Sequence, residues 1–251
     1  MKYFFPIVII AAALFLAREF FQAAPVTESS VTGSSPVSRG LVGKWPTGEG
    51  KTAAIDDDLA GSYLIVFDAS GSMKGRKLEE AKSAVKTLTE TVPENDYLGL
   101  VVFSNSTVDL LTPLGRGEAN RAAFASAVDS VDAGGGTPLG QAVETSVELL
   151  AEVARAQGTS GAHYTLLIVT DGEASDGAHL RRVLNTMLPL ERPPISPIIF
   201  QTIGFGIGER HILNQPGRTL YTSAQDGEAL REALKKITVE SASFEADTEF
   251  Q

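Results

Sequence analysis

The sequence contains no cysteine. This absence excludes disulfide bonds, zinc sites built on thiolates, iron–sulfur clusters and cysteine nucleophiles. Histidine is also scarce: only His163, His179 and His211 occur, and their scattered positions do not form the spacing of a zinc site. A bound metal ion would therefore be held mainly by oxygen atoms.

The chain has fewer positively charged than negatively charged side chains. The chain has 21 Lys and Arg residues against 31 Asp and Glu residues, which gives a formal net charge of −10. Such a charge repels phosphate groups and argues against a nucleic-acid partner. The hydrophobic content of 43% is ordinary for a folded core and does not suggest a polytopic membrane protein. The length of 251 residues suits one large α/β domain with appendages, or two small domains.

The N-terminus carries a long apolar run, Phe4–Ala17, which is interrupted only by Pro6. As a helix this run would reach about 21 Å, short of the ~30 Å hydrocarbon core of a bilayer. Cleavage after Ala24 would place Gln22 at a position that signal peptidases prefer to be small. We expect residues 1–24 to be an uncleaved membrane anchor, with a cleaved signal peptide and a secreted product as the alternative. In both cases the remainder would lie on the exported side, periplasmic or extracellular.

The segment 25–60 is rich in Ser, Thr, Gly and Pro and is expected to be a flexible tether. Within it, Gly48–Thr52 is similar to part of a phosphate-binding loop. However, Trp45 stands where that pattern requires glycine, and no strand precedes it, so nucleotide binding is not predicted. We expect the folded domain to span residues 61–240 and a C-terminal tail to span residues 241–251.

Apolar strand patterns and helical patterns alternate after the tether. The predicted strands are Ser62–Phe67, Tyr97–Phe103, Thr107–Leu111, Tyr164–Thr170, Ile198–Phe205 and a short one at Leu220–Tyr221. The predicted helices are Leu78–Thr91, 119–130, Leu139–Ala156, 178–188 and Glu228–Val239. Continuous apolar strands separated by helices are typical of a mostly parallel sheet with both faces covered. The fold class is therefore α/β, with Thr107–Leu111 close enough to the preceding strand to form a hairpin.

Oxygen-bearing side chains occur at three places where this sheet should end. Asp68, Ser70 and Ser72 follow the first strand, Thr137 lies in a glycine-rich loop before a long helix, and Asp171 follows the strand Tyr164–Thr170. Ligands bind at the carboxyl ends of parallel strands. Alternate residues of an extended segment point the same way, so Ser70 and Ser72 can face one point.

Each of these pieces has an ordinary structural explanation. Ser72 or Thr137 could cap a helix, and Asp171-Gly172 is a common turn pair. Their combination at one edge favours a binding site instead. Two carboxylates and three hydroxyls make a hard oxygen site suited to Mg²⁺ or Mn²⁺, with Ca²⁺ as a further candidate. The predicted metal-binding residues are Asp68, Ser70, Ser72, Thr137 and Asp171.

The sequence Asp68-Ala69-Ser70-Gly71-Ser72, with Thr137 and Asp171, resembles the metal-ion-dependent adhesion site of the von Willebrand factor type A family. The resemblance extends over roughly residues 60 to 240. It implies a Rossmann-like α/β/α fold with one antiparallel edge strand, here Thr107–Leu111. It also implies that Ser70, Ser72 and Thr137 bind the ion directly, and that Asp68 and Asp171 bind mostly through water. A Glu or Asp of a protein partner would complete the coordination.

We therefore expect an exported, membrane-tethered protein-binding module rather than an enzyme. A metal-assisted hydrolase using the same ion and a purely structural ion are the alternatives. Gly204–Gly208 follows a strand but lacks the spacing of a dinucleotide-binding loop, and no Gly-x-Ser-x-Gly motif occurs. The sequence leaves the identity of the partner and the oligomeric state open.

Overall fold

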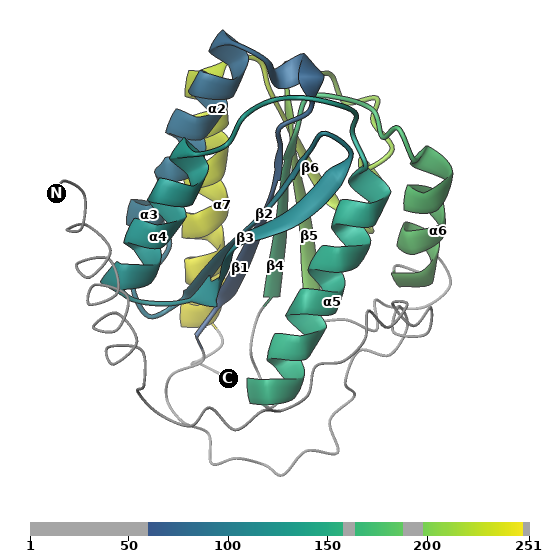
Figure 1. Ribbon diagram of the computed structural model, residues 1–251. Helices are drawn as coiled ribbons and strands as arrows, with labels where there is room; N and C mark the ends of the chain where they lie inside the picture. The colour runs from purple at the N-terminus through teal and green to yellow at the C-terminus, as the bar shows by residue number, and fades with distance from the viewer. Residues whose placement is uncertain (1–59, 158–163, 188–197, 248–251) are drawn as a thin grey trace, which may run out of the picture. The chain divides into compact units, whose positions relative to one another are not determined.

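The computed structural model describes residues 60–157, 164–187 and 198–247 (Figure 1). Its described strands form one six-stranded sheet in the order β3-β2-β1-β4-β5-β6. β3 runs antiparallel to β2, and the other neighbouring strands are parallel. The strands are β1 Ser62–Asp68, β2 Tyr97–Ser104, β3 Thr107–Gly115, β4 Tyr164–Thr170, β5 Ile198–Phe205 and β6 Leu220–Ala224.

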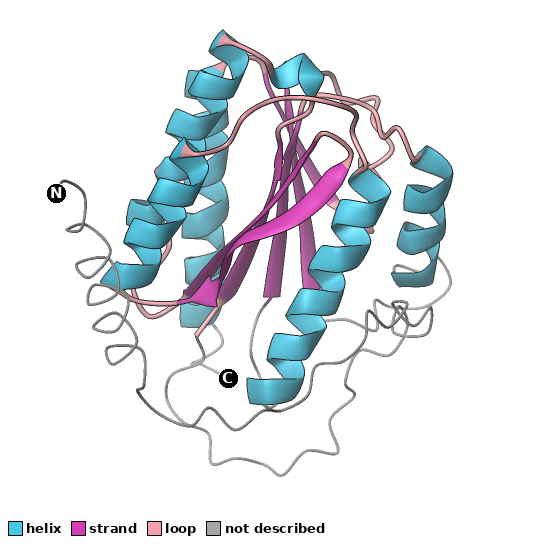
Figure 2. Ribbon diagram, in the orientation of Figure 1, coloured by secondary structure: helices cyan, strands magenta, loops and turns pink. Residues whose placement is uncertain are grey.

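Helices cover both faces of this sheet (Figures 1 and 2). Helices α2, α3, α4 and α7 pack on one face, and α5 and α6 pack on the other. The predicted three-layer α/β/α architecture with an antiparallel edge strand is therefore confirmed. The helical segments are η1 (a 3₁₀ turn) Gly71–Met73, α2 Arg76–Lys86, α3 Leu88–Thr91, α4 Glu118–Asp129, α5 Leu139–Gln157, α6 Gly177–Met187 and α7 Gly227–Asp247.

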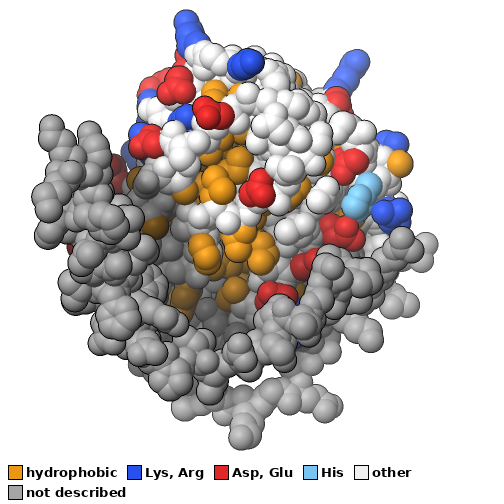
Figure 3. Space-filling view, viewed as in Figure 1, with side chains coloured by type: hydrophobic (Ala, Val, Ile, Leu, Met, Phe, Trp, Pro, Cys, Tyr) orange, Lys and Arg blue, Asp and Glu red, His pale blue; other side chains and the backbone are white. Residues whose placement is uncertain are grey.

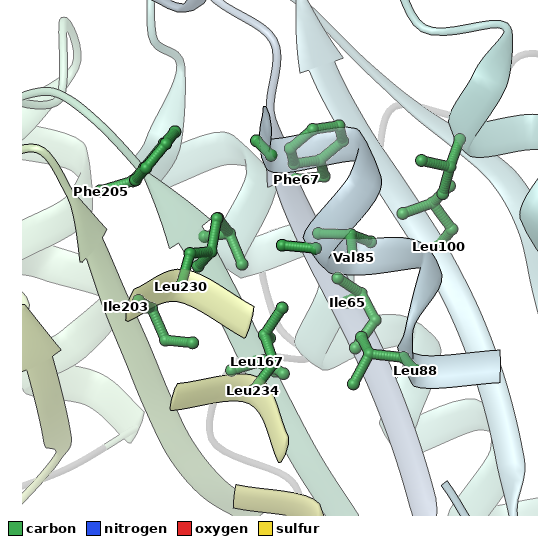
Figure 4. Close-up of a cluster of buried hydrophobic side chains, with 14 of the residues drawn as sticks. Ile65, Phe67, Val85, Leu88, Leu100, Leu167, Ile203, Phe205, Leu230 and Leu234 are labelled. Atoms are coloured by element: carbon green, nitrogen blue, oxygen red, sulfur yellow. The ribbon is translucent and has the colours of Figure 1, made fainter. Parts of the chain in front are cut away.

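The central strand β1 shows why its sequence is continuously apolar. Ile65 and Phe67 point into the cluster shared with α2, α3, α4 and α7 (Figure 4), whereas Leu64 and Val66 point into the cluster shared with α5 and α6. All four side chains are at most 1% exposed. A strand that is buried on both faces needs apolar residues at successive positions, so its sequence does not alternate between apolar and polar residues. The loop that carries Ser70 and Ser72 follows this buried strand.

The edge strand β3 is longer than its prediction, because it continues past Leu111 to Gly115 and includes Pro113. A proline lacks the N–H that a central strand needs, but an edge strand tolerates it. Leu110 and Leu111 are each 41% exposed. Both residues belong to β3. Hydrophobic side chains gather around this strand in the centre of Figure 3, and the strand lies between α4 and α5 in this view.

Two predicted helices differ from the observed ones. The segment Leu78–Thr91 was expected to be continuous, but α2 ends at Lys86 and α3 begins at Leu88. The break lies at Thr87, where the backbone N–H and the hydroxyl both donate to the carbonyl of Ala84, at 3.0 and 2.6 Å. This i−3 hydrogen bonding replaces the i−4 pattern of a continuous helix. The last helix continues to Asp247 beyond its predicted end at Val239.

The predicted anchor or signal segment, residues 1–24, lies outside the described residues, as does nearly all of the tether 25–60. Within the described ranges, no helix has both the length and the apolar character needed to cross a membrane.

The strand order creates a switch point between β1 and β4. From β1 the chain moves outward to β2 and β3, and then crosses to β4 and moves outward the other way to β5 and β6. Ligands in open α/β sheets bind at the carboxyl ends of the strands beside such a point. Asp68 ends β1 and Asp171 follows β4, so the topology brings two carboxylates from distant parts of the sequence to this position.

Candidate metal centre

Asp68 is the buried anchor of the site. Its Oδ1 accepts a hydrogen bond from the Ser70 N–H at 2.8 Å, and its Oδ2 accepts one from the Thr170 hydroxyl at 2.6 Å. The residue is 0% exposed. These bonds fix the carboxylate between the ends of β1 and β4. Thr170, the last residue of β4, was not predicted as a functional residue, because its side chain reads as part of the apolar strand.

A chain of hydroxyl hydrogen bonds leads from Ser70 to Asp171. The Ser72 hydroxyl donates to Asp171 Oδ1 at 2.7 Å, and the Ser70 and Ser72 hydroxyl oxygens lie 3.1 Å apart. Because Ser72 uses its proton on Asp171, it can only accept a hydrogen bond from Ser70. Ser70 is 1% exposed, whereas Ser72 is exposed, so the chain runs from the interior to the surface.

The glycine-rich loop before α5 packs between the other two loops. The Gly71 N–H donates to the Gly135 carbonyl at 2.9 Å, and the Ser175 N–H donates to the Thr137 carbonyl at 2.9 Å. Gly135 has a φ of +66°, and a Cβ there would lie 2.3 Å from the Cα of Asn105 in the β2–β3 turn. Only glycine fits this approach. Thr137 is thereby held next to the loops that carry Ser70, Ser72 and Asp171.

The start of α5 does not depend on the Thr137 hydroxyl. The carboxylate of Asp176 accepts hydrogen bonds from the N–H groups of Gly140 and Gln141, both at 2.9 Å. These amides belong to the first turn, which needs acceptors from outside the helix. The helix-cap explanation of Thr137 therefore loses its main support. Asp176 itself acts structurally, by joining the loop after β4 to α5.

His211 supports the turn that carries Asp171. Its Nδ1 accepts a hydrogen bond from the Leu213 N–H at 3.2 Å, and its Nε2 lies 3.0 Å from the Gly172 carbonyl oxygen. Since Nδ1 accepts a hydrogen bond, the neutral imidazole carries its proton on Nε2. Nε2 therefore donates to the Gly172 carbonyl. Tyr221 stacks on the ring at a centroid distance of 5.9 Å. This role could not be predicted from the sequence, since 39 positions separate His211 from Gly172.

Both aspartates of the site are buried, and they influence each other. Burial raises the pKa of the Asp68 carboxyl; hydrogen bonds from Ser70 and Thr170 lower it in part, and the charge of Asp171 raises it. The side chain of Asp171 is fully buried, and its Oδ2 lies 2.6 Å from the Nζ of Lys77. Burying carboxylates is costly unless positive charge or hydrogen bonds compensate them.

The donor set fits a hard divalent ion. It consists of carboxylate and hydroxyl oxygens, which suit Mg²⁺, Mn²⁺ or Ca²⁺. In the described part of the chain, no group of three or more Asp, Glu, His or Cys residues could hold a metal. A metal at the switch point would therefore rely on Ser70, Ser72 and Thr137 as well as on the two aspartates.

Neither serine of the site is paired with a histidine among the described residues. The Ser70 hydroxyl faces Ser72, and the Ser72 hydroxyl faces Asp171, so neither is bonded to a histidine. His211 instead faces backbone groups. No described histidine is therefore placed to act as the general base for either serine.

Comparison with proteins of known sequence gives several relatives. The chain is 26% identical over 163 residues to voltage-dependent calcium channel subunit alpha-2/delta-4 of Homo sapiens, covering 59% of this chain and 14% of the relative. It is 32% identical over 121 residues to inter-alpha-trypsin inhibitor heavy chain H3 of Bos taurus, covering 46% and 13%. It is 28% identical over 156 residues to the magnesium-chelatase 67 kDa subunit of Chlorobaculum tepidum, covering 62% and 24%. The chain thus spans less than a quarter of the length of each of these three relatives.

Solved structures share the fold. A von Willebrand factor type A protein from Catenulispora acidiphila superposes with a TM-score of 0.54 at 23% identity, over 71% of this chain and 42% of that one. Proximal thread matrix protein 1 from the mussel byssus superposes with a TM-score of 0.56 at 20% identity, over 72% and 48%. At these identities the likeness concerns the fold alone.

The sequence match to the family covers most of the chain. Residues 64–249 match the sequence model of the von Willebrand factor type A domain. This range includes all six strands except the first residues of β1, together with the loops that carry Asp68, Thr137 and Asp171. With the strand order and the solved structures in agreement, the chain belongs to the von Willebrand factor type A domain family.

Proposed function

We propose that this domain binds a protein partner through a divalent cation held at the switch point, in the manner of a metal-ion-dependent adhesion site. Magnesium is the proposed ion, with Mn²⁺ and Ca²⁺ as alternatives. The observation that carries the proposal is the convergence of three loops whose side chains offer hard oxygen atoms. The proposed ligands are Asp68, Ser70, Ser72, Thr137 and Asp171.

The proposed ligands differ in how deeply they are buried. Asp68 is buried and fixed by Ser70 and Thr170, so it is suited to hold an ion or its water molecules in place. Ser72 is exposed, and it marks the side from which an outside ligand would arrive. A bound divalent cation would supply positive charge that attracts an acidic ligand. We propose that a Glu or Asp of the partner is that ligand.

The proposal is tested by affinity capture. Full-length protein is immobilised and exposed to membrane and exported-protein extracts in Mg²⁺, in EDTA, and in EDTA followed by excess Mg²⁺. We expect a specific protein to be retained in Mg²⁺, released by EDTA and recovered when Mg²⁺ is restored. Retention that is indifferent to chelation would place recognition on another surface and leave the ion a structural role. Turnover of phosphate or ester substrates in Mg²⁺ would favour the hydrolase alternative.

We also propose that residues 1–24 anchor the protein in a membrane and that residues 25–60 tether the domain, residues 61–240, on the exported side, with residues 241–251 as a tail. The apolar run Phe4–Ala17 beside Lys2 and Arg18 motivates this arrangement. The native protein should stay in the membrane fraction after carbonate extraction and keep its original N-terminus. A mature N-terminus near Ala24 in a soluble exported fraction would instead establish a cleaved signal.

A further inference from the structure

Lys77 reaches back from the first turn of α2 into the proposed metal centre. Its Nζ lies 2.6 Å from Asp171 Oδ2, and the Lys77 side chain is 31% exposed whereas that of Asp171 is fully buried. The ammonium group also lies 5.6 Å from the centroid of the Phe205 ring. A Cβ on Gly206 would lie only 3.3 Å from Nζ, so the amine is packed against the end of β5. Lys77 is therefore held in place and is not an ordinary surface lysine.

The neighbouring cations do not share this position. Arg76 is directed outward, with a side chain that is 88% exposed and an Nε 2.7 Å from Glu80 Oε1. Lys74 is also exposed. Lys77 alone among these three makes an ion pair with a proposed metal-binding residue. Its effect on the site is consequently separable from that of general positive charge on this part of the surface.

The Lys77–Asp171 ion pair involves a residue of the proposed metal site. Asp171 Oδ1 accepts from Ser72 and Asp171 Oδ2 accepts from Lys77, so both carboxylate oxygens are engaged. Removing the partner of a buried carboxylate strongly destabilises the folded protein. Lys77 thus compensates the Asp171 charge in the absence of a metal, and it repels a second cation that approaches the same carboxylate.

We propose that Lys77 is a tethered competing cation that sets the metal affinity of this site. This inference rests on the proposed function, because it concerns the same metal centre. In the metal-free form, Lys77 satisfies Asp171 and keeps the loop after β4 in position. In the metal-bound form, the ion takes over that compensation and weakens the ion pair. The lysine therefore stabilises the metal-free form and makes metal binding weaker than the oxygen ligands alone would allow.

The test uses the full-length protein with Lys77→Met, which keeps an unbranched apolar side chain one heavy atom shorter than lysine and removes the charge. We expect the Kd for Mg²⁺ from titration calorimetry to fall at least tenfold. We also expect the metal-free variant to melt at a lower temperature than wild type and to show a larger rise in Tm with Mg²⁺. Lys77→Gln, which keeps a hydrogen-bond donor, provides a second variant if the methionine protein does not fold.

The matched control is Arg76→Met, which removes the same charge one residue away without touching Asp171. Its Kd should stay within about twofold of wild type. If wild type binds Mg²⁺ but neither Lys77 variant binds it more tightly, the competing role of Lys77 is refuted while the metal site stands. If wild type and both Lys77 variants all fail to bind Mg²⁺, Mn²⁺ and Ca²⁺, the proposed metal site itself is refuted, and the role of Lys77 falls with it. If a Lys77 variant binds Mg²⁺ and wild type does not, the result would support strong competition by Lys77.

Discussion

Replacing Asp68 by alanine should abolish the stability that Mg²⁺ gives to the protein. A ligand that binds only the folded state raises the free energy of unfolding by RT ln(1 + [L]/Kd), about 2.7 kcal/mol at one hundred times Kd. Asp68 is buried at the end of β1, where its carboxylate is fixed by Ser70 and Thr170, so alanine removes a carboxylate from the centre of the proposed site. The measurement is denaturant unfolding of wild type and variant, each with EDTA and with saturating Mg²⁺.

The comparison is made within each protein, because Asp68→Ala also removes the hydrogen bonds from Ser70 and Thr170 and lowers stability without metal. Glu173→Ala is the matched control. It removes an exposed carboxylate two residues after Asp171, and it should keep the Mg²⁺ response. A metal response in Asp68→Ala equal to that of wild type would show that Mg²⁺ binds elsewhere.

Much of the fold could be predicted because its strands are buried on both faces. The bounds of β4 and β5 agree with the predicted Tyr164–Thr170 and Ile198–Phe205, where apolar runs stop at polar or glycine-rich loops. The edge strand β3 was predicted too short, since Pro113 reads as a strand end although an edge strand tolerates proline. The end of α7 was predicted too early, because regularly spaced apolar residues cease near Val239.

The candidate site also contains residues that could be predicted from the sequence and residues that could not. Asp68, Ser70 and Ser72 could be predicted as a group because they alternate directly after a strand, and the parallel sheet placed Asp171 nearby. The supporting residues could not be predicted. Lys77 follows Arg76 in a charged helix start that reads as a solvated surface. Its place beside Phe205 and Asp171 is seen only in the folded structure. His211 contacts Gly172 through a loop whose path the sequence does not specify.

Thr137→Ala should weaken capture of the partner at least tenfold while leaving the domain folded. Thr137 is the proposed ligand from the glycine-rich loop, and its loss would remove one oxygen from the ion that meets the partner's carboxylate. Truncating one member of a desolvated charged contact typically costs about 2–5 kcal/mol, or roughly thirtyfold to several thousandfold in affinity. The affinity is measured by surface plasmon resonance with the partner identified by Mg²⁺-dependent capture.

Folding should survive this substitution because the first turn of α5 is satisfied by Asp176 rather than by the Thr137 side chain. Even a lost helix cap would cost only about 1 kcal/mol. Thr137→Ser keeps the hydroxyl and should retain most of the affinity, whereas EDTA should reduce wild type to the level of the alanine variant. Unchanged affinity in both Thr137→Ala and chelated wild type would mean that the partner contacts another surface. Loss in Thr137→Ala together with Thr137→Ser would instead point to the shape of this loop, since the serine variant still offers the oxygen that a metal requires.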